Sequence, residues 1–230
     1  MRGVPPRSID LIDAGATTKT ALEKAREAPG STKARILAAA EEVFAAKGYP
    51  GASTREIAAR AEVNISSLHY HWESKETLYF AVFRNVYDRI VDLLQNTLTP
   101  LLGGQRDATA PRPIIDVVMR ALFDFFADNP NVPKLLMRRI VENEEIDVGI
   151  ERDILVPSWK EFAAWVGGLG RRFSDVESRL FMLTVHSAML VYLLDSKPYQ
   201  SLLGGSVRAG TLREDVRQHV TDLVHRLLAP

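Results

Sequence analysis

Residues 53–72 constrain the fold more than any other stretch, because they predict two short helices joined by a tight turn. Ser53 lies three residues before Glu56, so the serine hydroxyl can cap a backbone amide while the carboxylate reaches back to the serine amide. Asn64 is a favourable N-cap for the second helix, which ends near His71. Each helix has only about two turns, too few to be stable alone in water. This helix-turn-helix therefore needs support from neighbouring helices.

The flanking sequence predicts those supporting helices. Apolar residues recur at helical spacing over residues 32–47, where Gly48 ends the run, and over residues 75–99, where Pro100 ends it. The second helix is longer than the small helix-turn-helix core requires, so it connects the two halves of the chain. A loop is expected over residues 103–113, which contain glycine, proline and aspartate.

The rest of the chain also shows helical periodicity, with neither strand-like alternation nor an internal repeat. The further helices are expected at residues 114–127, 132–143, 150–169, 174–195 and 211–228. Pro157 predicts a kink or restart within the third of them, and capping boxes predict the starts of the last two at Ser174 and Thr211. The expected fold class is all-α, with about nine helices.

Composition indicates a soluble protein and is compatible with a reducing compartment. The 230 residues balance 29 Lys and Arg against 29 Asp and Glu and include no cysteine, which excludes disulfides and cysteine-based zinc sites. Residues 1–30 lack the apolar core of a signal peptide and are expected to be largely disordered, with a transient helix over residues 17–27. Residues 180–194 are apolar nearly all round, but too short and too polar to span a bilayer. We therefore expect a cytoplasmic protein without membrane contact.

Three motifs follow one another within residues 31–83: GYPGAS at 48–53, TREIA at 54–58, and V-N-x-x-x-L-x-Y-H-W-x-S-K-E-x-L at 63–78. In this order and spacing they resemble the DNA-binding domain of the TetR/AcrR family of transcriptional regulators. The resemblance implies a three-helix helix-turn-helix domain at 31–83, and a larger helical ligand-binding and dimerisation bundle over 84–230. Beyond the first domain, the chain agrees with the family only in the number and layout of helices.

Such a domain would bind a double-stranded DNA operator. A recognition helix places its N-terminal residues at base edges in the major groove, while flanking residues contact phosphates. The positions of the second helix that would face bases or lie along its exposed sides are Ile65, Ser66, Ser67, His69, Tyr70 and His71. The resemblance adds contacts to phosphates or bases from the starts of the neighbouring helices, at Thr54, Arg55 and Lys75.

Some of these residues have simpler explanations. Thr54 and Lys75 are also typical of solvated helix starts. His71 has the alternative of packing against Trp72, which we expect in the core. On a helix, His69 and His71 point about 200° apart and make a poor metal pair.

The expected DNA-binding domain is electrically neutral, which is unusual for a DNA-binding protein. Residues 31–83 contain six Lys or Arg and six Asp or Glu. The preceding tail adds five more cations, Arg2, Arg7, Lys19, Lys24 and Arg26. We therefore predict that DNA affinity depends modestly on salt, with no more than about ten phosphates neutralised per dimer.

The C-terminal half has the composition to enclose an apolar cavity among helices, a common site type in bundles. The candidate lining residues are aromatic, sulfur-containing or isolated polar side chains: Phe123, Phe126, Met137, Trp159, His186, Met189 and Tyr192. The alternative for each is a plain core residue, and for His186 a buried histidine with satisfied hydrogen bonds. The acidic run at residues 142–147 is expected to be a solvated helix end.

These features predict a homodimeric, ligand-responsive DNA-binding transcriptional regulator, specifically a repressor that an unidentified apolar small molecule releases. Residues 174–195 and 211–228 have apolar surface to spare and would pair across the dimer. The sequence has no Gly-rich phosphate loop and no cluster of histidines and carboxylates, so no catalytic residue, cofactor or metal ligand is assigned. An enzyme or carrier fused to a helix-turn-helix is disfavoured. The main alternative is a constitutive DNA-binding architectural or interaction protein without a ligand.

Overall fold

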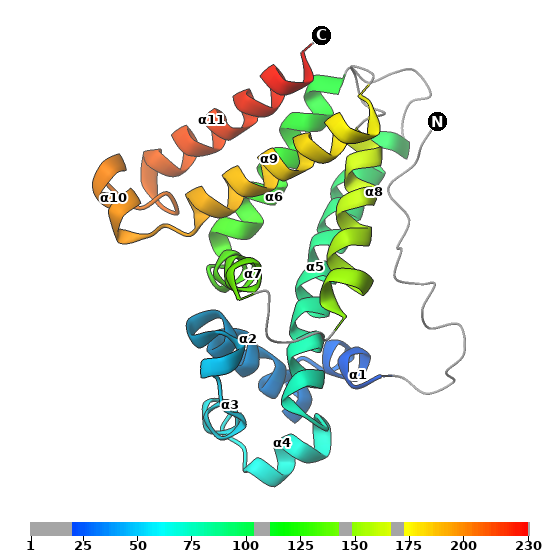
Figure 1. Cartoon of the computed structure of the whole chain (residues 1–230), viewed down its shortest axis with the longest axis vertical. Coiled ribbons are helices and arrows are strands. Elements are labelled where there is room, and N and C mark those ends of the chain that lie inside the picture. Colours follow the sequence, from blue (N-terminus) through cyan, green and yellow to red (C-terminus); the bar gives the residue numbers. More distant parts are fainter. Residues whose placement is uncertain (1–19, 104–110, 143–148, 167–172, 230) are drawn as a thin grey trace. The chain divides into compact units, whose positions relative to one another are not determined.

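The computed structural model describes residues 20–103, 111–142, 149–166 and 173–229. These residues form eleven α-helices and one π-helical turn and contain no strand (Figure 1). The all-α prediction is confirmed. Of the eleven helices, the sequence did not predict α10 (Lys197–Leu203) and predicted α1 (Ala21–Glu27) only as a transient helix.

The helices divide into two compact units. The described part of the N-terminal unit comprises residues 20–88, 134–142 and 149–155, and the C-terminal unit contains the remaining described residues. The N-terminal unit contains α1, α2 (Thr32–Gly51), α3 (Thr54–Arg60), α4 (Ile65–His71), the first part of α5 (Lys75–Gly103), most of α7 (Asn131–Val141) and the π-helical turn Glu151–Leu155. The C-terminal unit contains the rest of α5, α6 (Pro111–Asp128), α8 (Val156–Val166), α9 (Asp175–Leu193), α10 and α11 (Gly210–Leu228).

The core of the N-terminal unit forms where α2 to α5 bury their apolar faces. Ile57 of α3 and Leu68 of α4 are fully buried, and burying a side chain of this size contributes roughly 1.5–3 kcal/mol. An aromatic cluster joins α2 to α5, because the Tyr79 ring lies 4.8 Å from Phe44 and 5.0 Å from Phe83, between ring centroids. These contacts support the two short helices that could not stand alone.

The end of α2 is held by α7, although the two helices are far apart in sequence. Gly48 breaks the helical backbone with φ of +70°, which confirms the predicted C-cap. The Arg138 guanidinium donates to the carbonyl oxygens of Ala45 and Ala46, satisfying groups that a helix end leaves without partners. The Glu142 carboxylate accepts a hydrogen bond from the Tyr49 amide at 3.3 Å. The prediction of a solvated acidic helix end is therefore wrong for Glu142, and residues 143–147 lie outside the described residues.

Helix α1 is an ordered part of the N-terminal unit. Thr20 and Glu23 form a capping box, and Ala25 is buried. The Arg26 guanidinium lies 2.8 Å from the Asp88 carboxylate of α5. The transient helix expected over residues 17–27 therefore has a counterpart that these contacts stabilise, and the disorder expected for the rest of the tail stays a prediction. Residues 1–19 lie outside the described residues.

Two helix boundaries differ from the prediction at prolines. Helix α5 continues through Pro100 to Gly103, because a proline this close to the C-terminal end costs only the hydrogen bond to the carbonyl of residue 96. Helix α6 begins at Pro111 rather than at Ile114. A first-turn amide has no partner within its helix, so prolines are tolerated there. The expected loop at 103–113 therefore shrinks at both ends, and residues 104–110 are not described.

The predicted restart near Pro157 is confirmed, because the π-helical turn ends at Leu155 and α8 begins at Val156. The capping box at Ser174 is also confirmed, with the Ser174 hydroxyl accepting from the Glu177 amide at 3.2 Å. The capping box at Thr211 is wrong. Helix α11 begins one residue earlier, after the N-cap Ala209, so Thr211 lies inside the first turn and caps nothing.

The core of the C-terminal unit lies between α6, α9 and α11, which pack against one another. Val118 of α6, Val185 of α9 and Val220 of α11 are buried. At the edge of this core, the guanidinium groups of Arg213 and Arg217 both bind the Asp124 carboxylate, at 2.8 and 3.0 Å. This network fixes α11 on α6.

Helix α10 lies in the connection between α9 and α11. Asp195 closes this connection: its carboxylate accepts hydrogen bonds from the Ser206 hydroxyl at 2.6 Å and the Val207 amide at 3.0 Å. None of the α10 side chains is buried, and Leu202 is 80% exposed. Among the described residues no single helix is long and apolar enough to cross a membrane, and α9 with α10 would meet those criteria only as a pair bent by 88°.

Candidate functional site

Helix α4 is oriented by its cap and by one buried leucine. The Asn64 side-chain oxygen accepts a hydrogen bond from the Ser67 amide at 2.7 Å, as its N-cap position predicted. Glu62 adopts a left-handed backbone with φ of +54°, and the Val63 amide closes the turn by donating to the Ala58 carbonyl. With Leu68 fully buried, the opposite face of α4 must point to solvent.

That outward face carries most of the residues predicted to touch DNA. Ile65, Ser66, His69 and Tyr70 are exposed, and Tyr70 is the most open of them at 84%. Their positions i, i+1, i+4 and i+5 lie on one side of a helix. The two remaining predicted residues of α4, Ser67 and His71, are half-buried.

The start of α3 differs from the expected capping box in one respect. The Ser53 hydroxyl accepts from the Glu56 amide at 3.1 Å, as predicted. The Glu56 carboxylate instead pairs with Lys47 at 2.7 Å, because the lysine ammonium at the end of α2 lies within reach. Next to the cap, Thr54 is half-buried and Arg55 is exposed, with no ion pair to any described residue.

Lys75 at the start of α5 is held over an aromatic ring. Its ammonium lies 4.1 Å from the centroid of Tyr49, a cation–π contact. The Tyr49 hydroxyl donates to the Glu76 carboxylate, and this hydrogen bond lowers the pKa of Glu76. Burial lowers the pKa of Lys75, although the nearby Glu76 charge opposes that effect. The sequence analysis missed Tyr49, and only its place in the GYPGAS motif could have pointed to it.

His71 and Trp72 lie on the inner side of the α4 end. Trp72 is 2% exposed, which confirms the expected core position. Burial lowers the pKa of His71, and the Lys33 ammonium lowers it further. This favours the neutral ring at pH 7. No three metal-binding side chains come together within the part of the chain that the structure describes.

Ion pairs within the domain occupy some of its cations. Lys47 pairs with Glu56, and Arg60 pairs with Glu42 at 2.5 Å, so two of the six cations face carboxylates. Lys75 remains available on its aromatic support and Arg55 at the start of α3. Both lie at helix starts that flank α4, where flanking phosphate contacts are expected.

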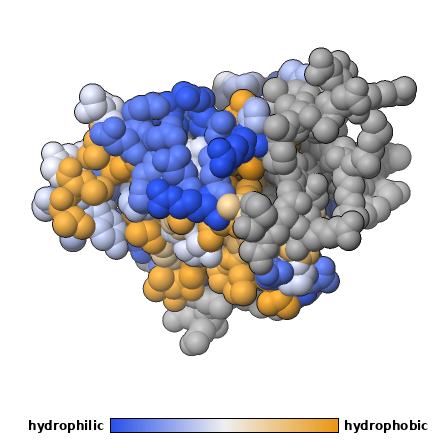
Figure 2. Space-filling view, turned by 90° about the horizontal axis from the view of Figure 1, so that it is seen from above, coloured by the Kyte–Doolittle hydropathy of each residue, from blue (hydrophilic) through white to orange (hydrophobic). Residues whose placement is uncertain are grey.

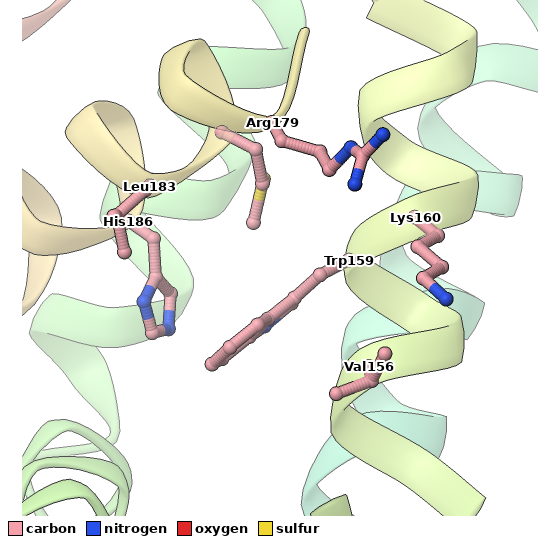
Figure 3. Close-up of a pocket in the computed structure, with 7 residues that line it drawn as sticks. Val156, Trp159, Lys160, Arg179, Leu183 and His186 are labelled. Carbon is pink, nitrogen blue, oxygen red and sulfur yellow. The ribbon is translucent and has the colours of Figure 1, made fainter. Parts of the chain in front are cut away.

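A second candidate site is a pocket of about 260 Å³ in the C-terminal unit, between α8 and α9. Figure 3 shows the Trp159 indole extending from α8 toward His186 of α9, and their ring centroids are 5.0 Å apart. Burial lowers the pKa of His186 to about 4, so the ring is neutral at pH 7. The pocket is lined by Val156, Trp159, Lys160, Arg179, Met182, Leu183 and His186.

Of the seven predicted ligand-binding residues, the structure brings Trp159 and His186 together in this pocket. Phe123, Phe126 and Met189 are buried side chains that do not line it. Tyr192 is half-buried with its ring 6.0 Å from His219, and Met137 belongs to the N-terminal unit.

The other lining residues were not among the seven candidates. Those on α9 lie at positions i, i+3, i+4 and i+7: Arg179, Met182, Leu183 and His186. Helical spacing back from His186 could therefore have found Arg179. Nothing in the sequence pattern pairs this row with α8.

With this geometry in place, comparison with known proteins is informative. Residues 36–82 match the model of the bacterial regulatory proteins of the tetR family. The chain is 36% identical over 93 residues to the HTH-type transcriptional activator FasR of Mycolicibacterium smegmatis, covering 40% of this chain and 39% of FasR. It is 32% identical over 117 residues to the HTH-type transcriptional regulator RutR of Escherichia coli, covering 51% of each. Residues 36–82 of the chain therefore belong to the tetR family of DNA-binding segments.

The similarity to these known proteins extends over different shares of the chain. The chain spans about half the length or less of FasR and RutR. Both are named as transcriptional regulators, in agreement with the prediction that the chain is not an enzyme. A TetR transcriptional regulator from Legionella pneumophila matches over 84% of this chain and 97% of its own, with a TM-score of 0.60 and 22% identity. That likeness shows the shared all-α fold.

Proposed function

We propose that this protein is a homodimeric DNA-binding transcriptional regulator of the TetR family that acts in the cytoplasm, as a repressor released from its operator by a small molecule. The observation that carries the proposal is the outward face of α4. Ile65, Ser66, His69 and Tyr70 are exposed together on a helix whose opposite side is anchored by fully buried Leu68. A recognition helix needs this combination of rigid support and exposed, varied side chains.

The proposed dimer contact is the outer face of α9. Val176, Leu180 and Val191 are 60%, 57% and 36% exposed and lie on one side of the helix. In Figure 2, apolar residues are exposed beside a strongly hydrophilic area. Contiguous exposed apolar surface is typical of association sites, and a twofold contact would supply the second recognition helix. A dimer of this kind binds two half-sites whose spacing matches the protein.

The proposed response to a ligand involves α8. The chain runs directly from the π-helical turn into α8, which carries Trp159 in the pocket. Glu151 of that turn binds the nearly buried Arg139 of α7 at 2.5 Å through two oxygens, and Arg139 in turn interacts with Tyr79. A ligand that shifts α8 therefore acts on the ion pair of the nearly buried Arg139 inside the N-terminal unit, and a small rotation would misplace the recognition helices.

The experiment is a mobility-shift titration with the full chain and the DNA upstream of its own gene, at low salt and then with added salt. We expect a shifted complex with dimer stoichiometry and a modest salt slope. Absence of a complex with every fragment at low salt would contradict DNA binding.

A constitutive DNA-binding protein without a ligand is the alternative. The pocket volume of about 260 Å³ favours it, because ligand sites usually occupy roughly 300–1,000 Å³. Thermal unfolding with a set of small apolar compounds separates the two functions. A ligand raises the unfolding temperature with its concentration, whereas a protein without a site shows no change.

A further inference from the structure

We propose that the pocket between α8 and α9 selects a compact apolar molecule that carries a negative charge, such as an aromatic or short-chain carboxylate. The inference rests on the proposed function, since it names the chemical class of the effector. It follows from the apolar walls of the pocket and from the two cationic residues, Lys160 and Arg179, that line it.

The interior offers contact area but few polar partners. Trp159, Met182 and Leu183 supply an aromatic, a thioether and an aliphatic surface, and Val156 closes the α8 side. The polar groups among these side chains are the His186 ring, which lies against the Trp159 indole, and the N–H of that indole. A planar or short apolar body suits these walls and the volume of about 260 Å³.

Two exposed cationic residues, Arg179 and Lys160, and no acidic residue line the pocket at its mouth, where their aliphatic stems form part of an almost wholly apolar surface. Arg179 extends from α9 toward α8 (Figure 3), and its Nε donates to the Asp175 carbonyl at 3.0 Å, which fixes the stem and leaves the terminal nitrogens available. Lys160 follows Trp159 on α8. Neither cation pairs with a carboxylate in the described ranges, and no acidic residue lines the pocket.

This arrangement discriminates by charge. A carboxylate at the mouth would accept hydrogen bonds from the Arg179 guanidinium while its apolar body fills the interior. An ammonium group on the same body would be repelled by both cations. Because the cations are exposed, each pair is weak and screened by salt, so a moderate preference is expected.

The experiment compares three probes with the same ring system: 1-naphthoate, 1-naphthalenemethanol and 1-naphthylmethylammonium. Binding to the full chain is measured by calorimetry and by quenching of tryptophan fluorescence at low salt. We expect 1-naphthoate to bind at least tenfold more tightly than the ammonium probe, and this ratio to fall as salt is raised. Equal binding of the two ions, a preference for the ammonium, or binding of no probe would overturn the inference.

Two double variants test whether Lys160 and Arg179 cause the preference for the anionic probe. The double variant Lys160→Gln with Arg179→Gln should bring the ratio of anion to cation affinity close to one. The matched control is Lys197→Gln with Arg226→Gln, which removes two exposed charges from α10 and α11 and should leave the ratio unchanged. An equal loss of discrimination in both variants would show a general effect of net charge and overturn the assignment to this mouth.

Experiments with operator DNA distinguish a failure of this inference from a failure of the proposed function. If 1-naphthoate binds with the expected selectivity but does not weaken the DNA complex, the ligand class stands and the proposed release mechanism fails. If the protein binds DNA but none of the three probes, the inference fails and the DNA-binding proposal stands.

Discussion

At the scale of single residues, α4 combines structural support and recognition in seven positions. Leu68 is fully buried and Tyr70 is 84% exposed, although only one residue separates them. Helical spacing alone predicted this difference, because Leu68 continues the apolar face. The cation–π contact between Lys75 and Tyr49 could not be predicted in the same way, since it depends on how two helices pack.

Replacing Tyr70 and Leu68 separately tests this division. Tyr70→Ala should weaken operator binding by roughly 1–3 kcal/mol, the range for a base-edge contact. It should change the free energy of unfolding by less than about 0.5 kcal/mol, because the side chain is exposed. Leu68→Ala should instead cost about 2–5 kcal/mol of stability through the cavity it leaves. Urea unfolding and DNA titration of both variants provide the measurement, and unchanged affinity in Tyr70→Ala would remove that residue from the interface.

His186 makes the stability of the C-terminal unit depend on pH. Burial lowers its pKa to about 4, whereas an unfolded chain has a histidine pKa of about 6.5. Between these values the unfolded chain binds more protons, so stability is complete above about pH 6.5 and falls by up to roughly 3 kcal/mol as the pH approaches 4. Unfolding curves across this range should lose most of that slope in His186→Phe. The exposed His69→Gln is the control, and an identical slope in His186→Phe would rule out His186 as the cause.

At the scale of helices, the presence of each helix was easier to predict than the residues at which it begins and ends. Each of the nine expected helices has a counterpart, because amphipathic spacing extends over several turns. The ends depend on single contacts. Gly48 interrupts the helical backbone of α2 as expected, although α2 continues to Gly51, whereas Pro100 did not stop α5 and Thr211 did not cap α11. Helix α10 was missed because it buries no apolar face and has no periodic stripe.

The two expected capping boxes differ in a measurable way. Ser174→Ala should destabilise the C-terminal unit by about 0.5–2 kcal/mol, because the Ser174 hydroxyl caps the Glu177 amide. Thr211→Ala should have an effect close to zero, since α11 has no side-chain cap. Thermal unfolding of the two variants compares the same hydroxyl deletion at two helix starts. Equal losses would contradict the assigned helix start of α11.

The contact of α7 with the end of α2 gives a second test at this scale. Arg138→Ala removes the donors to the Ala45 and Ala46 carbonyls. It should destabilise the N-terminal unit by about 1–2 kcal/mol, since hydrogen bonds from a charged group are strong but this side chain is 38% exposed. Amide hydrogen exchange in the last turn of α2 should quicken. Arg152→Ala, at a far more exposed arginine of the same unit, should leave that exchange unchanged.

At the scale of the whole molecule, the sequence indicated two parts but not which residues belong to each part. The expected domain boundary near residue 83 stays a prediction, while contacts group residues 134–142 and 149–155 with the N-terminal unit. The hydrogen bond from Arg138 to Ala45 joins residues 93 positions apart, and no local pattern reports such a pairing. The pocket escaped prediction for the same reason, because its walls come from two helices whose packing the sequence does not specify.

The proposed dimer is testable through α9. Leu180→Glu places a charge in the centre of the proposed contact and should weaken association at least about tenfold, since burying an unpaired carboxylate is costly. Val117→Glu on α6, at a similarly apolar but 37% exposed site, is the control. Sedimentation equilibrium measures the monomer–dimer balance. If Leu180→Glu remains as dimeric as the control, another surface forms the dimer.

The hydrogen bonds that Arg138 and Glu142 form with the end of α2 have a consequence for protein engineering. Sensors with new specificities are made by grafting one regulator's DNA-binding segment onto another's ligand-binding part. A graft of residues 31–83 alone would leave the Ala45 and Ala46 carbonyls uncapped and the Tyr49 amide without its carboxylate. A transplant that also carries residues 134–155 would keep the recognition helix on its native support.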